Sequence, residues 1–157
     1  AIFEKQKTNG ALTAMGHLIS LLSGIPPQVV KRIPFTVFKR CEVFLLRFLN
    51  YTPETLAPGA VPACSVQIAL ETLLEDASGK QSWSHIGLSE PNLEQVDQFY
   101  KAQSATSGLA AMAVLISELS DIAPEVVNRL KFTDYKRCEG YLLGFLNYSP
   151  TAVAGGI

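Results

Sequence analysis

The stretch FKRCEVFLLRFLNYTP, residues 38–53, returns as YKRCEGYLLGFLNYSP at residues 135–150. Both stretches belong to a longer alignment without gaps, in which residues 8–56 match residues 105–153 at a constant offset of 97. Of the 49 aligned positions, 26 are identical, which is far more than chance matching gives. Similarity of a chain to itself at a fixed spacing is typical of repeated structural units. The sequence therefore predicts a tandem duplication.

Each copy predicts three helices. The first carries an apolar stripe at helical spacing, and the second begins with a proline, which is tolerated in the first turn. The third is expected to be capped by Thr36 in the first copy and by Thr133 in the second, and it carries a buried stripe. The predicted helices are 10–23, 26–32 and 37–50 in the first copy, and 107–120, 123–130 and 134–147 in the second.

The segment between the copies differs in kind. Residues 57–62 are rich in proline and glycine and predict a linker. Alternating apolar residues on both sides of a turn sequence predict a β-hairpin at 64–88. Asn92, followed by Gln95, resembles a capping box that opens one more helix to about residue 103. We therefore expect a predominantly α, α+β fold of two three-helix units, 1–56 and 63–157, the second preceded by the hairpin and the extra helix.

Composition excludes several classes of protein. The 157 residues carry 13 basic and 14 acidic side chains, so a dominant phosphate-binding surface is not expected. No apolar run is long enough to span a membrane, and no signal peptide precedes the first copy. Three cysteines, an odd number, favour a reducing compartment over a disulfide framework. A mean hydropathy of +0.20 is high for a monomer without partners and hints at self-association or a partner.

Catalytic chemistry finds little support. His17 is replaced by Val114 in the second copy, which favours a packing position over a base or a ligand. His85 has no cysteine or carboxylate at ligand spacing. Cys41 and Cys138 stand in a repeated KRCE motif, where basic neighbours can activate a thiol, but both fall on the apolar stripe and are expected to be packed in the core. We predict no catalytic residues, no metal, no cofactor and no small-molecule substrate.

The third helices carry more apolar residues than one stripe needs, which predicts packing against another unit or a partner. The alternative is that the two copies bury these faces on each other. A helix-turn-helix contact with DNA is a further alternative, although the third helix is mostly apolar where a recognition helix needs polar, basic residues. The candidate partner-binding residues are Phe44, Leu46, Tyr141, Leu143, Trp83, Phe99 and Tyr100.

Residues 66–148 resemble the tail assembly chaperones of Mu-like and P2-like phages and prophages. The resemblance rests on IGLSEPNLEQV at 86–96, LISELSDIAPEVVNRL at 115–130 and FTDYKRCEGYLLGFL at 132–146. The first copy carries LISLLSGIPPQVV at 18–30, but it has Val37 where the second copy has Asp134, and it lacks the hairpin. The tandem arrangement also departs from the single unit that is usual in the family.

The resemblance implies a protein that is not an enzyme. Such chaperones bind the long helical tape measure protein before the tail tube protein polymerises around it, keep its apolar segments soluble, and then leave. They are made in the cytoplasm of the infected bacterium and tend to oligomerise. A minor structural component of the tail or virion is the alternative reading. A whole first copy would also need an upstream hairpin of about 35 residues, equivalent to 62–97.

Overall fold

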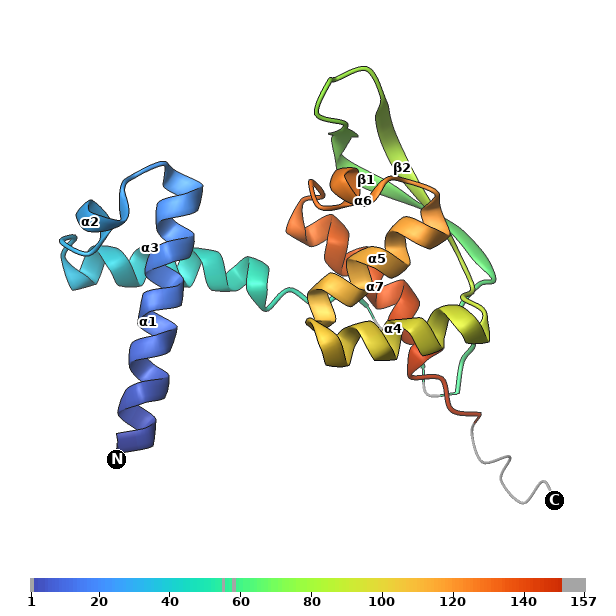
Figure 1. The fold of residues 1–157 in the computed structure, drawn as a ribbon, viewed down its shortest axis with the longest axis horizontal. Helices are drawn as coiled ribbons and strands as arrows, with labels where there is room; N and C mark the ends of the chain where they lie inside the picture. The colour runs from blue at the N-terminus through green and yellow to red at the C-terminus, as the bar shows by residue number, and fades with distance from the viewer. Residues whose placement is uncertain (1, 55, 58, 151–157) are drawn as a thin grey trace. The chain divides into compact units, whose positions relative to one another are not determined.

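The computed structural model describes residues 2–54, 56–57 and 59–150, and side chains from residue 10 onward. This part of the chain contains three helices, then two strands, then four helices (Figure 1). The chain divides into two compact units, residues 1–50 (unit 1) and residues 51–157 (unit 2). The prediction of an α+β fold that is mostly helical is thereby confirmed. No helix of the described residues is long and apolar enough to cross a membrane.

Unit 1 consists of α1 (Ile2–Ser23), α2 (Pro27–Val30) and α3 (Phe35–Leu49). Its core is small. Among the side chains described, from residue 10 to residue 50, three hydrophobic ones are buried, one from each helix, and several half-buried ones pack against them. The buried side chains are Ile19, Val30 and Phe38.

The first helix begins well before residue 10, where the sequence predicted its start. At the equivalent place in unit 2 the chain breaks between two helices, because the Ser107 side chain caps the following helix by accepting a hydrogen bond from the amide of Ala110 at 3.1 Å. Gly10 occupies the position of Ser107 in unit 1 and has no side-chain oxygen to offer. Helix α1 therefore runs through Gly10 without interruption.

The first regular elements of unit 2 are the two strands of an antiparallel hairpin, and the helices that follow gather on one side of it (Figure 1). Helix α5 packs on β2, helix α7 packs on β1, and α4 lies against α5. The elements are β1 (Ser65–Glu75), β2 (Ser82–Ser89), α4 (Leu93–Ala105), α5 (Gly108–Ser120), α6 (Pro124–Val127) and α7 (Phe132–Leu146).

The hairpin is irregular in the middle of β1. Its strands pair regularly from Ser65 to Ala69, but the register shifts before Leu74. A bulge leaves backbone groups without partners across the strands. Side chains of α7 supply them: the buried Asp134 carboxylate accepts the amide of Glu71 at 3.3 Å, and Arg137 donates to the carbonyl of Ala69. Arg137 also pairs with Asp134 at 3.2 Å, so one ion pair fixes the hairpin to the helix.

The core of unit 2 is larger than that of unit 1 and draws on the hairpin and all four helices. Burial of apolar surface is the main favourable term in folding, so most of the stability of unit 2 comes from this contact between sheet and helices. The largest fully buried hydrophobic side chains are Ile86, Leu88, Met112, Leu115, Ile116, Cys138 and Leu142.

The observed first residues of the helices show which of the predicted N-cap residues are correct. The capping box at Asn92 and Gln95 is confirmed, with reciprocal hydrogen bonds of 2.9 and 3.0 Å. The N-caps at Thr36 and Thr133 are wrong, because α3 and α7 each start one residue before the threonine. The preceding Pro34 and Lys131 have extended backbones with φ near −60°, which turn the chain into the helix without a side-chain cap.

Several local contacts recur 97 residues apart. Helices α2 and α6, and helices α3 and α7, begin and end at this spacing. The Ser20 hydroxyl donates to the carbonyl of Ile25 at 2.6 Å, and the Ser117 hydroxyl donates to that of Ile122 at the same distance. Left-handed backbone ends α1 at Gly24 and α5 at Asp121.

Candidate partner-binding surfaces

The structure divides the predicted partner-binding residues of unit 2 by burial. Phe99 is buried, so it stabilises the fold and is not part of an exposed surface. Trp83, Tyr141 and Leu143 are half-buried and pack against the same core. Tyr100 is exposed and stands edge-on to Phe99 with ring centroids 5.5 Å apart.

In unit 1, Phe44 is exposed and Leu46 is half-buried. The Phe44 ring stands edge-on to Phe48, with centroids 5.2 Å apart, and Phe48 is exposed as well. Both rings remain accessible on the same helix, α3. Of the predicted partner-binding residues, Phe44 in unit 1 and Tyr100 in unit 2 are therefore the exposed ones.

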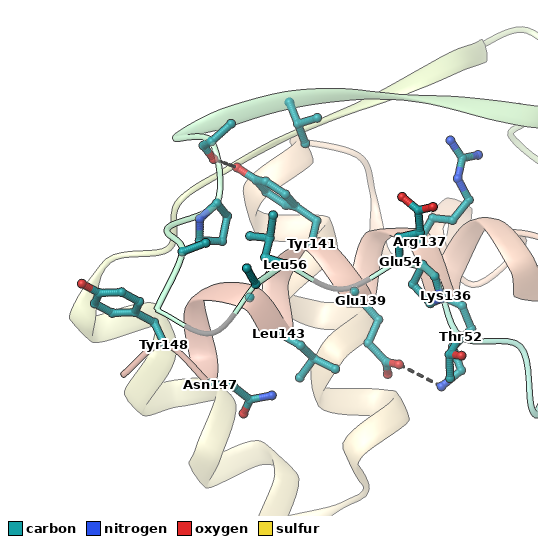
Figure 2. Close-up of a pocket in the computed structure, with 18 of the residues that line it drawn as sticks. Thr52, Glu54, Leu56, Lys136, Arg137, Glu139, Tyr141, Leu143, Asn147 and Tyr148 are labelled. Atoms are coloured by element: carbon teal, nitrogen blue, oxygen red, sulfur yellow. Dashed lines mark hydrogen bonds and ion pairs between the residues drawn. The ribbon is translucent and has the colours of Figure 1, made fainter. Parts of the chain in front are cut away.

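Unit 2 has a hollow of about 820 Å³ between the segment that precedes the hairpin, residues 51–63, and helix α7 (Figure 2). The predicted linker, 57–62, falls in this segment, and the Pro62 ring lies close to Gly144 of α7. The Tyr141 hydroxyl donates a hydrogen bond to the carbonyl of Ala63 and ties the end of the segment to the helix (Figure 2). Leu143 and Asn147 also line the hollow.

Two glycines of α7 let the segment approach. A Cβ atom on Gly140 would lie 2.6 Å from the Pro53 ring, and one on Gly144 would lie 2.7 Å from the Pro62 ring. Unit 1 has Val43 and Arg47 at the equivalent positions of α3. The glycines therefore give unit 2 a close contact that the side chains of unit 1 exclude.

The close contact at Gly140 predicts that one added methyl group will make the segment before the hairpin easier to cleave. We expect Gly140→Ala to displace the segment from α7, and chymotrypsin to cut it after Tyr51 or Leu56 several-fold faster, because local opening governs proteolysis. The matched control is Gly108→Ala, where the added Cβ meets only the Gln103 side chain at 3.6 Å. Equal cleavage rates in both variants and the parent would contradict the close contact.

Sequence reasoning missed a larger apolar surface in unit 1. Ile25 is 41% exposed although its counterpart Ile122 is 4% exposed, because Ile122 belongs to the core that the hairpin completes. The alignment could have located this surface, since among the described residues only unit 2 includes a hairpin that covers the equivalent positions. Between residues 10 and 50, the exposed large apolar residues are Leu21, Leu22, Ile25, Val29, Phe35, Val37, Val43, Phe44, Phe48 and Leu49.

A groove of about 470 Å³ lies among the three helices of unit 1. Most of its lining is apolar, and His17 and Lys31 also contribute. The Phe35 ring lies parallel to Phe38 at 5.9 Å between centroids, and the Lys39 ammonium lies 5.5 Å from the Phe35 centroid. Apolar grooves of this kind accept helices by burying one face of the partner.

Both histidines lie at exposed positions. His17 is exposed, as is Val114 at the equivalent position, so solvent exposure rather than packing explains the exchange. His85 is exposed and contacts the Ser84 hydroxyl at 2.9 Å. Within residues 10–150, apart from 55 and 58, no three His, Cys, Asp or Glu side chains come together as a metal site would need.

The cysteines differ in accessibility. Cys138 is completely buried, and this burial, together with the nearby Asp134 charge, raises the pKa of its thiol to about 12. Its expected place in the core is confirmed, whereas Cys41 is half-buried and Cys64 is exposed.

These environments predict an order of thiol modification. At pH 8 we expect a thiol-specific reagent to modify Cys64 fastest, Cys41 more slowly, and Cys138 only after unfolding, because the thiolate is the reactive form and needs access. Peptide mass spectrometry after timed quenching measures the order. Rapid labelling of Cys138 in the folded protein would contradict its burial.

Residues 76–147 match a phage tail assembly chaperone family. The family is described as phage tail assembly chaperone proteins, E, or 41 or 14. The chaperone-family segment starts at the turn of the hairpin and includes β2 and helices α4 to α7, a little under half of the chain. No curated protein and no solved structure matches the chain. The match supports a role in tail assembly.

Proposed function

We propose that the protein is a phage tail assembly chaperone that binds the tape measure protein and keeps it soluble before the tail tube forms. The match of residues 76–147 carries the proposal. The exposed apolar side chains, among them Phe44 and Phe48 in unit 1 and Tyr100 in unit 2, support it, because a chaperone needs accessible apolar surface for its client. The action is binding without catalysis, in the cytoplasm of the host bacterium.

We also propose that the chain arose by tandem duplication and that it has further partners. The identities between residues 8–56 and 105–153, and the contacts that recur at the same spacing, support a tandem duplication within a Mu-like or P2-like type. The tail tube protein is a second candidate partner. Self-association is also part of the proposal.

Coexpression with the tape measure protein of the same phage or prophage tests the function. We expect the tape measure protein to become soluble and to copurify with the full chain. Phe44→Ser removes an exposed ring and should reduce the recovered complex, while Leu73→Ser changes an exposed leucine on the hairpin and serves as the matched control. A tape measure protein that stays insoluble, with no complex recovered, would overturn the proposal.

A minor structural component of the virion is the alternative, and purified particles separate the two. A chaperone is absent from finished tails, whereas a structural component copurifies with them. A DNA-binding role predicts duplex binding that weakens with salt. Helix α3 argues against it, because its exposed residues include Val43, Phe44 and Phe48 among the basic ones.

A further inference from the structure

The two units carry opposite charges. Residues 1–50 contain seven Lys and Arg against two Asp and Glu, a formal charge of +5. Residues 51–157 contain six Lys and Arg against twelve Asp and Glu, a formal charge of −6. The net charge of −1 conceals this split. Surfaces of opposite charge attract each other at short range and orient their encounter.

The exposed positions of unit 1 are adapted to an apolar contact. Leu21 is exposed where unit 2 has the exposed Glu118, and Val37 is exposed where unit 2 has the hairpin-binding Asp134. The second exchange matters most, because a valine cannot hold the backbone of a strand as Asp134 does. Unit 1 thus lacks the carboxylate that holds the hairpin in unit 2. Its groove offers apolar side chains with Lys31 among them, which suits a helix that is apolar and acidic on one side.

Helix α4 of unit 2 is such a helix. Its inner side packs on the core through Phe99, but its outer side carries Leu93, which is 85% exposed, and the exposed Tyr100. Asp97 lies between them at helical spacing and is exposed, with Glu94 in the first turn. Asp97 pairs with Lys101 at 2.9 Å, but both side chains are largely in solvent, so this pair is easily exchanged.

We propose that the groove of unit 1 binds helix α4 of a second copy of this chain. Leu93 and Tyr100 enter the apolar groove beside Phe35, and Asp97 faces Lys31. Each chain then has one groove and one α4, so the contact joins two different surfaces. Such a contact closes in a two-fold dimer when each groove takes the α4 of the other chain, and otherwise extends to rings or open chains. The inference gives a geometry to the self-association in the proposed function. It is tested on this chain alone, so its failure would leave the proposed binding of the tape measure protein untouched.

Light scattering after size-exclusion chromatography of the full chain tests the contact. The expected mass rises with protein concentration and falls at high salt, because salt screens the opposite charges. Phe35→Glu in the groove and Leu93→Glu on α4 should each weaken association by about tenfold or more, as apolar anchors at interface centres do. Leu73→Glu, an exposed leucine of the hairpin, is the control and should associate as the parent does.

Mixing the two weakened chains decides the geometry. The Phe35→Glu chain keeps its α4 and the Leu93→Glu chain keeps its groove, so the mixture should form a complex of one chain of each. The double change Lys31→Glu with Asp97→Lys should restore association that each single reversal weakens. Circular dichroism and Trp83 fluorescence verify that every variant is folded.

Three outcomes overturn the proposal. The first is a parent chain that stays monomeric at all concentrations. The second is that both glutamate variants associate as the parent does. The third is that the mixture of the two variants forms no complex, which would mean that the contact joins identical surfaces. A duplex gel shift adds one more arm. If Lys31→Glu abolishes salt-sensitive DNA binding while the parent stays monomeric, the groove region serves nucleic acid and the proposal is wrong.

Discussion

Leu142→Ala is expected to lower the free energy of unfolding of unit 2 by about 2–5 kcal/mol, the range for emptying a buried leucine site. Leu142 has no exposed surface and lies in the core between the hairpin and helices. Urea unfolding followed by tryptophan fluorescence measures the loss. Trp83 is the single tryptophan and packs against this core, so its signal reports unit 2.

Leu45→Ala is the matched control, since Leu45 is the equivalent leucine of unit 1. Leu45 is half-buried and packs against a core of three buried side chains, so the cavity left behind is smaller. The fluorescence transition of Trp83 should stay where it is in the parent. An equal shift in both variants would contradict the division of the chain into separate cores.

Asp134→Val is expected to lower the free energy of unfolding of unit 2 by about 1–3 kcal/mol, because a buried hydrogen-bonding group loses its partner. The amide of Glu71 loses its acceptor, and Arg137 loses its carboxylate. Both effects act at the irregular part of β1, where the register with the partner strand shifts. Amide exchange of Glu71 should accelerate more than that of residues outside the bulge.

Val37→Asp is the reciprocal change in unit 1. Val37 is exposed, so the carboxylate there should change stability by no more than about 0.5 kcal/mol. The pair of variants separates the hairpin contact from a general preference for aspartate near a helix start. If Asp134→Val leaves both stability and the exchange of Glu71 unchanged, the carboxylate does not hold the hairpin.

Local signals in the sequence predicted most helices and the hairpin. Asn92 and Gln95 predicted the start of α4, because a capping box is formed by two residues three positions apart in the sequence. The turn after β1 was recognisable because Gly79, with φ of 71°, suits the left-handed backbone that the turn needs. These features depend only on residues that are close together in the chain, and such residues can be read directly from the sequence.

The helix starts and the candidate surface were harder to predict. Thr36 and Thr133 are good capping residues, but backbone geometry set by the residues before them starts the helices earlier. Phe99 and Phe44 look alike as apolar helical residues, and only tertiary packing makes Phe99 part of the core and leaves Phe44 exposed. The alignment of the copies contained part of this information.

The sequence by itself determined the helical units, the hairpin and the apolar excess, because periodicity and turn chemistry are local properties. Only the tertiary structure decided which apolar residues are covered. Leu142 and Leu45 stand at equivalent positions, yet one is buried and the other half-buried. Burial depends on what packs from outside the helix, and in unit 2 that is a hairpin anchored by Asp134 and Arg137 at a bulge.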